Sequence, residues 1–330
     1  MERVACIDIG TVTVRLAVAD MEGSRVVRML KRSTICNLGE GLSATGMICD
    51  EARGRVVGCV DAYLQMMQTA DAHRVCCTLT SAARDASNSQ DLLDDLTRRG
   101  IRPQIIAGEV EGSLTFLGVA QDFPDRRILV ADNGGGSTEL AVGSLGAGEG
   151  LRIDGVHSTD VGCRRITERF LSDHDLPTEA DLAAARGFAR ELFGPVIDQE
   201  KILDRALRPS RLVVTGGTAT SLVAIHKGLE PYDSSQVHLA SLTRAQVEDL
   251  AARLARLTEA QRADLPGLQA KRAPVILAGA LAIAELMAQT RFDQLTVSES
   301  DLLFGLSICA GRAAEGEALP FDWEVLLSEV

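Results

Sequence analysis

Hydrophobic and polar residues alternate from residue 3 to residue 19, with a break at Asp8-Ile9-Gly10-Thr11. Alternation with a period of two is typical of half-buried strands, so we predict two strands joined at this break. A third antiparallel strand is expected next to them. The elements that complete this first α/β unit are a third strand at 24–35, a helix at 50–70, a strand at 75–80, a helix at 91–99, a strand at 104–107 and a helix at 109–121.

The second half of the chain repeats this order of patterns. Three strand-like segments again come first, and helical segments separate the later strands. The expected elements are strands at 127–132, 137–143 and 151–157, helices at 162–171 and 178–194, a strand at 211–215 that leads into a helix, helices at 243–257 and 271–289, a strand at 294–297 and a helix from 301.

The two halves also resemble each other in sequence. VACIDIGTVTVRLAVAD and RILVADNGGGSTELAVG share an apolar strand, an aspartate, a polar turn with glycine and a second apolar strand. We therefore expect two domains, residues 1–124 and 125–330, with a hinge near DFPDR at 122–126 and a cleft between duplicated lobes. The helix from about residue 301 is a candidate to pack back on the first domain.

Composition narrows the class of protein. The 330 residues are 46% hydrophobic and 3% aromatic, as expected for aliphatic cores, and no apolar run reaches the roughly 20 residues that span a bilayer. The chain enters a strand pattern at once, so we expect a cytoplasmic enzyme. A net charge of −12 argues against nucleic acid and membrane as partners. The eight cysteines show no zinc spacing.

The glycine run at 134–136 stands between two strand-like segments, so it differs from a P-loop or a dinucleotide fingerprint, which lead into a helix. A hairpin turn of this kind exposes backbone N–H groups that can bind an anion. Asp132 and Glu139 beside it could hold Mg²⁺, often through water. The alternative is that the glycines only permit a tight hairpin.

A third glycine turn, Gly216-Gly217-Thr218, follows a strand and begins a helix, where N–H groups and the helix dipole favour an anion. Tight packing between strand and helix explains such a turn equally well. The specific signal is the occurrence of three such turns in one chain.

These turns resemble those of the actin, sugar kinase and Hsp70 superfamily, and eight ordered blocks resemble the exopolyphosphatase and guanosine pentaphosphate phosphohydrolase (Ppx/GppA) family in its short, two-domain form. The resemblance implies two ribonuclease-H-like, actin-like ATPase domains with an interdomain cleft. The blocks are DIGTVTVRL (8–16), TSAARDASN (80–88), IAGEVEGSLTFLGV (106–119), DNGGGSTEL (132–140), VGCRRITERF (161–170), TGGTATSL (215–222), RAPVILAGALAIAELM (272–287) and SESDLLFGL (298–306).

The resemblance implies hydrolysis of a terminal phosphoanhydride bond, in polyphosphate or in pppGpp, with Mg²⁺ or another divalent cation. It places a general base at Glu111, with Glu109 as a helix-start residue, although both could merely complement the helix dipole. It makes Asp132 and Glu139 the metal-linked acids. The phosphate-binding residues that it implies are Asp8, Gly10, Thr11, Arg84, Gly134, Gly135, Gly136, Ser137, Thr138, Gly216, Gly217 and Thr218.

Two positions depart from the family pattern. Val12 stands where the family usually has asparagine, which puts substrate affinity or choice in doubt, and Asn133 stands where it usually has an apolar residue. Because of Val12, a catalytically weak phosphate or alarmone sensor stays open as an alternative. A kinase of the same superfamily is disfavoured because kinases lack the GEVEG-type glutamate. A homodimer is the family-based expectation.

Polyphosphate and pppGpp would need different residues around the phosphate site. Polyphosphate requires a basic channel, whereas pppGpp requires a pocket for its base, and the residues available for each fit ordinary surface or core roles too. The cations are Lys31, Arg32, Arg164, Arg165, Lys271 and Arg272, and the aromatics are Phe116, Phe123 and Tyr232.

Overall fold

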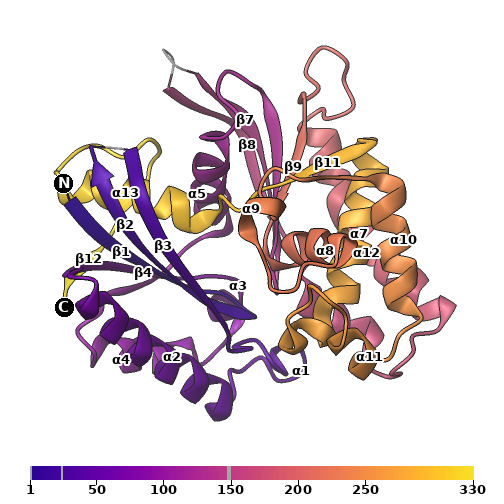
Figure 1. The fold of residues 1–330 in the computed structure, drawn as a ribbon, viewed down its shortest axis with the longest axis horizontal. Helices are drawn as coiled ribbons and strands as arrows, with labels where there is room; N and C mark the ends of the chain where they lie inside the picture. Colours follow the sequence, from indigo (N-terminus) through magenta and orange to yellow (C-terminus); the bar gives the residue numbers. More distant parts are fainter. Residues whose placement is uncertain (1, 24, 147–149) are drawn as a thin grey trace. The chain divides into compact units, whose positions relative to one another are not determined.

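The computed structural model describes residues 2–23, 25–146 and 150–330 (Figure 1). Contacts along the chain divide it into two units: residues 1–118 with 302–330 form the first unit, and residues 119–301 form the second. Each unit is built on one six-stranded mixed sheet covered by helices. The expected α/β fold with two such domains is confirmed.

The first sheet has the strand order β12-β4-β1-β2-β3, and β5 pairs with β4 off this path. β1, β2 and β3 form an antiparallel meander, whereas β4 runs parallel to β1 and β5 parallel to β4. The bounds are β1 (Glu2–Ile9), β2 (Thr13–Glu22), β3 (Arg25–Ile35), β4 (Arg74–Leu79), β5 (Pro103–Ile105) and β12 (Leu327–Glu329). Residue 24, where the third strand was expected to begin, lies outside the described residues.

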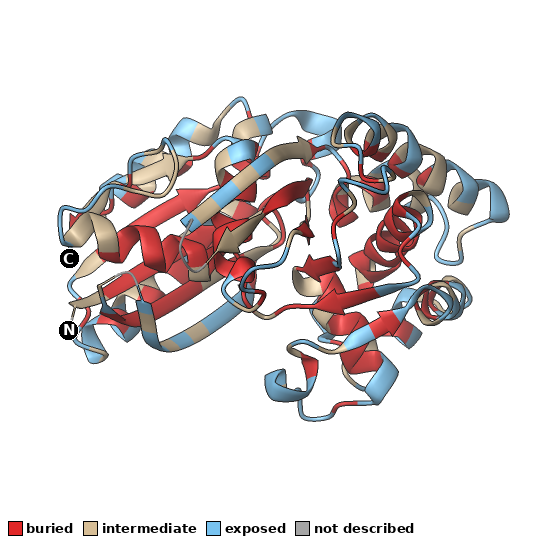
Figure 2. Cartoon of the chain, turned by 90° about the horizontal axis from the view of Figure 1, so that it is seen from above, coloured by how far each residue is buried: buried red, intermediate tan, exposed pale blue. Residues whose placement is uncertain are grey.

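Helices cover both faces of this sheet because successive side chains of a strand point to opposite faces. On one face, Ala5, Ile7 and Ile9 of β1 share a hydrophobic core with α2. On the other face, Cys6 contacts Ser307 of α13. In Figure 2 the central strands are accordingly buried. The helices of the first unit are α1 (Leu42–Thr45), α2 (Asp50–Thr69), α3 (Ser81–Asp85), α4 (Ser89–Thr97), α5 (Gly108–Ala120) and α13 (Leu302–Ala314).

The C-terminal segment completes the first unit. α13 packs on β1 and β2, and β12 pairs antiparallel with β4. The sequence did not predict β12, because three residues are too few to show an alternating pattern.

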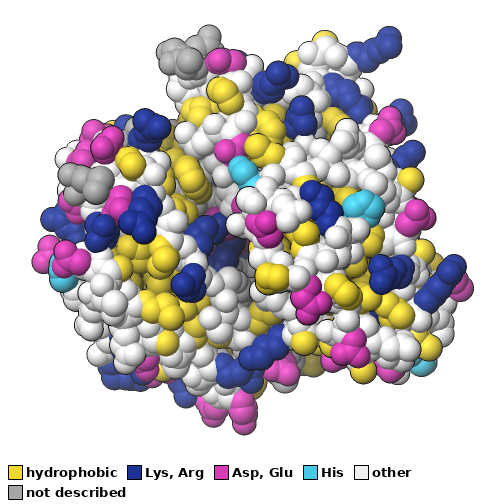
Figure 3. Space-filling model, in the orientation of Figure 1, with side chains coloured by type: hydrophobic (Ala, Val, Ile, Leu, Met, Phe, Trp, Pro, Cys, Tyr) yellow, Lys and Arg dark blue, Asp and Glu magenta, His cyan; other side chains and the backbone are white. Residues whose placement is uncertain are grey.

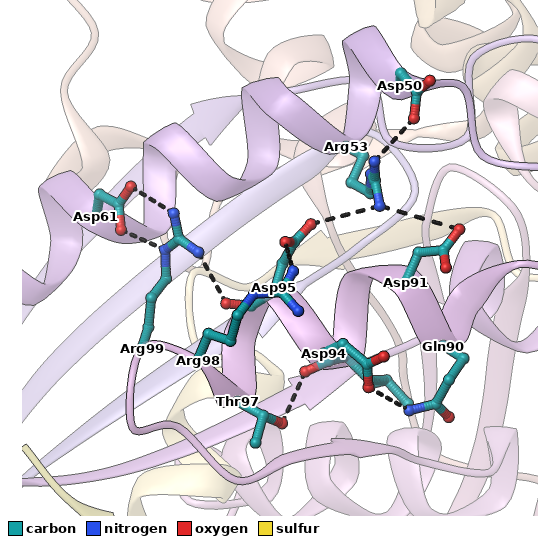
Figure 4. A network of polar contacts seen from close by, with 11 residues as sticks. Asp50, Arg53, Asp61, Gln90, Asp91, Asp94, Asp95, Thr97, Arg98 and Arg99 are labelled. Carbon is teal, nitrogen blue, oxygen red and sulfur yellow. Dashed lines mark hydrogen bonds and ion pairs between the residues drawn. The ribbon is translucent and has the colours of Figure 1, made fainter.

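Charged side chains join α2 to α4 (Figure 4). Arg99 donates two hydrogen bonds to the carboxylate of Asp61, at 2.5 and 3.0 Å, and Arg53 lies within 4.0 Å of both Asp91 and Asp95. The hydrogen bond from Arg99, and then its charge, hold the pKa of Asp61 below its ordinary value.

This lowered pKa predicts a pH-dependent contribution to stability. Asp61→Asn is expected to lower the free energy of unfolding at pH 7 by about 0.2–1 kcal/mol, the usual range for an exposed ion pair. Because the pKa of Asp61 is lower in the folded protein than in the unfolded chain, ionised Asp61 stabilises the fold at pH values above its unfolded pKa of about 3.9. This contribution disappears as the pH falls through the folded-state pKa. Urea unfolding at pH 7, 5 and 3 should therefore show a difference that shrinks with acidity. Asp249→Asn, at an exposed position of α10, is the control and should show none.

The second sheet has the order β10-β11-β9-β6-β7-β8, in which β9-β6-β7-β8 repeats the order β4-β1-β2-β3 of the first. β6, β7 and β8 form an antiparallel meander. On the other side of β6 lies β9 and then β11, both parallel to β6, and β10 pairs antiparallel with β11 at the edge. This agrees with the repeated sequence pattern. The bounds are β6 (Ile128–Asn133), β7 (Thr138–Gly146), β8 (Gly150–Thr159), β9 (Leu212–Thr215), β10 (Ser241–Thr243) and β11 (Gln294–Val297).

The helices of the second unit pack around α12, which contacts α6, α7, α8 and α10. Among the described residues, the segment 270–290 that contains α12 is the one long and apolar enough for a membrane span, but 83% of its 18-residue apolar stretch is buried inside the structure. Its apolar character is that of a core helix. The helical segments are α6 (Cys163–Ile166), η1 (Thr167–Leu171), α7 (Glu179–Gln199), α8 (Gly217–Lys227), α9 (Ser234–Val237), α10 (Arg244–Ala255), α11 (Glu259–Ala263), η2 (Ala270–Arg272) and α12 (Ala273–Thr290).

α7 is longer than expected. The helix was expected to end near 194, and Pro195, which cannot donate a helical hydrogen bond, comes next. The helix instead continues to Gln199. Phe193 and Ile197 on either side of the proline are buried, and α7 packs on α12, so tertiary packing outweighs the lost hydrogen bond.

Candidate functional site

Three expected site segments of the first unit meet at one edge of its sheet. β1, β4 and β5 are parallel, and the turn at Gly10, the helix with Arg84 and the helix with Glu111 follow their carboxyl ends. The Thr80 amide donates to Ile9 oxygen and the Ile106 amide to Leu79 oxygen, which ties these ends together. Ligands of open α/β sheets bind outside this edge of the strands.

The first hairpin is closed by an ion pair that the sequence analysis did not single out. The register places Asp8 opposite Arg15, and Arg15 donates to Asp8 Oδ2 from Nε and Nη2, at 2.9 and 2.7 Å. Asp8 is 1% exposed. Its negative charge is thus matched by arginine, so it holds Arg15 beside the turn. The signal was present in the sequence, because a hairpin that turns at 10–13 brings Asp8 and Arg15 together.

The turn itself uses its backbone internally. The Gly10 amide donates to Thr13 oxygen at 2.9 Å, and the carbonyl of Val12 accepts from Cys36 and Asn37. The Val12 side chain is buried. An apolar residue therefore fits this position of the chain, where the family usually has asparagine.

Glu111 and Arg84, which come from different helices, form an ion pair at 2.8 Å. Arg84 Nη1 also donates to Ile106 oxygen at 2.9 Å, which fixes the guanidinium. Glu111 is 8% exposed in the first turn of α5, whereas Glu109 is exposed. Glu111 thus stands at the positive end of the α5 dipole with a guanidinium beside it. The structure thus separates the two glutamates, and only Glu111 is buried beside an arginine.

Two glycine turns of the second unit also lie side by side. β6 and β9 are parallel, and Asp132 is paired with Thr215, the residue before Gly216. A Cβ on Gly216 would lie 2.7 Å from Asn133 oxygen and 3.0 Å from Asp132 Oδ1, and Gly216 has a φ of +98°. Glycine is therefore required at 216, and its absence of a side chain lets the Asp132 carboxylate approach the third turn.

The hairpin at 134–136 matches the first hairpin in its closure. The Gly134 amide donates to Ser137 oxygen at 3.0 Å, as Gly10 does to Thr13. Within the described part of the chain, the amides of Gly135 and Gly136 donate no hydrogen bond. They are the donors that remain for an anion at this turn.

Side chains at the base of this hairpin are used for structure. Asn133 Nδ2 donates to Thr138 Oγ1 at 2.9 Å, and the Thr138 hydroxyl donates to Val161 oxygen. This contact explains the polar residue at 133. Thr218 is likewise buried, and its side chain occupies the space left by Gly279 of α12. The Thr138 hydroxyl is thus committed to this hairpin, and the Thr218 side chain is packed against α12.

Asp132 and Glu139 stand directly opposite each other on β6 and β7, and both are buried. Ser158 Oγ donates to Glu139 Oε1 at 2.7 Å. Like charges directly opposite each other destabilise a sheet, and a cation removes the repulsion. Mg²⁺ is commonly held by one or two carboxylates together with water and substrate phosphates, so this donor set fits it. No group of three or more His, Cys, Asp or Glu able to hold a metal occurs among the described residues.

Arginines approach both turns of the second unit. Arg165 Nε donates to Gly136 oxygen at 2.9 Å, and the Arg272 guanidinium occupies the place where a Cβ on Gly217 would stand. The amide of Arg164 donates to Gly135 oxygen at 2.8 Å. Charge alone made these arginines candidates for a channel, and the structure places them against the turns.

Gly162 makes the tightest of these backbone approaches. A Cβ at this position would lie 2.2 Å from Gly136 C and 2.3 Å from Gly135 oxygen, both of which are backbone atoms. Gly162→Ala is therefore expected to lower the free energy of unfolding by about 1–3 kcal/mol, the usual cost of overpacking. Thermal and urea unfolding measure this change.

Gly187→Ala is the matched control for Gly162→Ala. Gly187 lies inside α7 with nothing near its missing Cβ, so alanine there should stabilise the protein by about 0.5–1 kcal/mol. The same sign for both substitutions would contradict the described packing of the segment 161–165 on the turn.

Comparison with known proteins gives one consistent result. The family model described as "Ppx/GppA phosphatase family" matches residues 17–306. Exopolyphosphatase 2 of Mycobacterium tuberculosis is 33% identical over 93% of this chain and 98% of its own length. Exopolyphosphatase 1 of Mycobacterium bovis is 30% identical over 96% of this chain and 89% of its own.

Solved structures agree with these sequence matches. An exopolyphosphatase from Cytophaga hutchinsonii has a TM-score of 0.84 at 25% identity, covering 96% of this chain and 99% of its own. A Ppx/GppA family member from Aquifex aeolicus has a TM-score of 0.76 at 28% identity, covering 96% of this chain and 99% of its own.

Proposed function

We propose that this chain, which belongs to the Ppx/GppA phosphatase family, is an exopolyphosphatase that releases orthophosphate from the end of inorganic polyphosphate. The observation that carries the proposal is the buried Glu111 carboxylate, held by Arg84 at the start of α5. The names of the relatives, at about 30% identity over nearly the full length of this chain, support the choice of substrate class.

In the proposed reaction, Glu111 accepts a proton from water, and the water oxygen forms a bond to the terminal phosphorus. The bond from that phosphorus to the bridging oxygen breaks, and the shortened polyphosphate leaves. Arg84 is proposed to pair with phosphate oxygens, because a guanidinium matches them bidentately. In the second unit, the amides of Gly135 and Gly136 and the turn at Gly216–Thr218 are proposed to stabilise negative charge. In the first unit this role is proposed for the Thr11 amide, because the Gly10 amide already donates to Thr13 oxygen. Asp132 and Glu139 are proposed to hold Mg²⁺, which would neutralise charge on phosphate bound at the second unit.

The aromatic residues favour polyphosphate over pppGpp. A guanine pocket needs exposed rings, but Phe116 and Phe123 are buried. Tyr232 is exposed, and its hydroxyl bonds to Glu299. Of the three rings considered for a base pocket, two are therefore part of the cores.

The test is phosphate release from long polyphosphate, tripolyphosphate, pppGpp and ATP, each with Mg²⁺ and with EDTA. We expect long polyphosphate to give the highest kcat/KM and EDTA to abolish release. Glu139→Gln should raise the Mg²⁺ concentration needed for half-maximal rate. A preference for pppGpp would establish the alternative substrate, and binding without release from any of the four would establish the sensor. A cytoplasmic location and a homodimer are part of the proposal, and fractionation and light scattering test them.

A further inference from the structure

β3 is a basic edge strand in an acidic protein. The chain has 34 Lys and Arg against 46 Asp and Glu, but the 11 residues of β3, RVVRMLKRSTI, include four Lys or Arg and no acid. β3 ends the first sheet and pairs with β2 on one side. Figure 3 shows Lys and Arg side chains beside hydrophobic ones over this region of the first unit.

The arginines of this strand are available for a ligand. Arg25, Arg28 and Arg32 are exposed, and in the described structure none of them takes part in an ion pair. Two acids of β2 face this strand in register: Glu22 lies opposite Arg25, and Asp20 lies opposite Arg28 and bonds to Arg3 at 2.6 Å. The four cations of β3 outnumber these two acids, so the strand keeps a positive excess.

Within the same unit, β3 leads to the turn of the first hairpin, between β1 and β2. After Ile35, the amides of Cys36 and Asn37 donate to Val12 oxygen, and the Gly39 amide donates to Thr11 oxygen. Arg25 and Arg32 are seven residues apart, or about 23 Å along an extended strand. A long linear anion could therefore follow β3 and end at the turn beside Asp8 and Arg15.

We propose that β3 is a docking site for long-chain inorganic polyphosphate, with Arg25, Arg28 and Arg32 as its cationic contacts. The ligand class rests on the proposed function. Charge complementarity carries the choice of occupant, because an evenly spaced polyanion matches arginines spread along one strand. β3 includes no aromatic residue on which a base could stack, so nucleic acid fits less well. A second copy of β3 would bring like charges together, which disfavours self-pairing.

The experiment measures binding separately from hydrolysis. In the Glu111→Gln background, titration calorimetry compares long polyphosphate with tripolyphosphate for the parent and for Arg28→Glu/Arg32→Glu. We expect the double substitution to raise the Kd for long polyphosphate about tenfold or more. It should also reduce the slope of log Kd against log salt by about two. Binding of tripolyphosphate, which is too short to follow the strand, should change less than about twofold.

The matched control is Arg102→Glu/Arg126→Glu, which makes the same change in net charge at two exposed arginines outside β3. It should leave both affinities nearly unchanged. If circular dichroism shows that Arg28→Glu/Arg32→Glu is unfolded, Arg28→Gln/Arg32→Gln takes its place. Equal effects of the control and β3 variants would overturn the proposal, as would an unchanged Kd.

Two further measurements test single-stranded RNA and a second copy of this chain as alternative partners of β3. Single-stranded RNA of equal charge should bind the parent more weakly than polyphosphate, and equal binding would overturn the proposal. If light scattering shows a dimer that dissociates in the β3 variant, β3 is a surface for self-association, and this result would also overturn the proposal.

If the wild type binds polyphosphate through β3 but releases no phosphate, the proposed function fails and the docking site stands. If the wild type releases phosphate but the β3 variants bind polyphosphate as well as the parent does, the proposed function stands and the docking site fails.

Discussion

Glu111→Gln is expected to lower kcat for phosphate release from polyphosphate by about 10²–10⁴-fold, the usual contribution of a general base. Glutamine has nearly the same shape and can still accept a hydrogen bond from Arg84, which now bonds to Glu111 Oε2 at 2.8 Å. It cannot accept a proton from water. KM and the unfolding temperature should therefore change little, and initial rates with malachite-green detection of phosphate measure the loss.

Glu109→Gln is the control for this result. Glu109 lies in the same first turn of α5 but is exposed, so its replacement should leave kcat within about twofold. Full activity of Glu111→Gln would remove Glu111 as the base. Equal losses for the two variants would show that the negative charge of the helix start matters rather than proton transfer.

Arg15→Met is expected to lower the free energy of unfolding by about 3–5 kcal/mol, because it takes the arginine partner from a buried carboxylate. Asp8 is 1% exposed and accepts two hydrogen bonds from Arg15. Methionine keeps much of the apolar stem, so the measured loss reports mainly on the charge. Urea unfolding at pH 7 is the measurement.

A double-mutant cycle makes this prediction specific. Asp8→Asn/Arg15→Met removes both charges and should be more stable than Arg15→Met alone, because no carboxylate is left buried without its arginine. Arg102→Met, at an exposed position outside any described ion pair, should cost less than about 0.5 kcal/mol. Additive losses in the cycle would contradict the coupling between Asp8 and Arg15.

The sequence predicted those features that depend on neighbouring residues along the chain. Alternation predicted the two meanders, and the aspartate and glycines located both hairpin turns. Resemblance distinguished Glu111 from Glu109, and burial of only Glu111 is consistent with that choice. The site roles themselves remain proposals.

Other features depend on contacts between distant segments, for which local patterns hold no signal. Arg272 lies against Gly217 although 55 positions separate them, and charge alone identified it only as a channel candidate. β12 finds its partner in β4 across most of the chain. α7 passes Pro195 because of its packing on α12, which local propensity does not include.

The two hairpins differ in how they balance the charge of their aspartate. In the first, the facing position holds Arg15, so the counter-charge is encoded in the chain itself. In the second, the facing position holds Glu139, so an acid stands where the first hairpin has its arginine. One exchange of residue type at equivalent places has thus turned a salt-bridged strand pair into a pair of carboxylates. The duplicated hairpins share a backbone but present opposite charges beside the same aspartate.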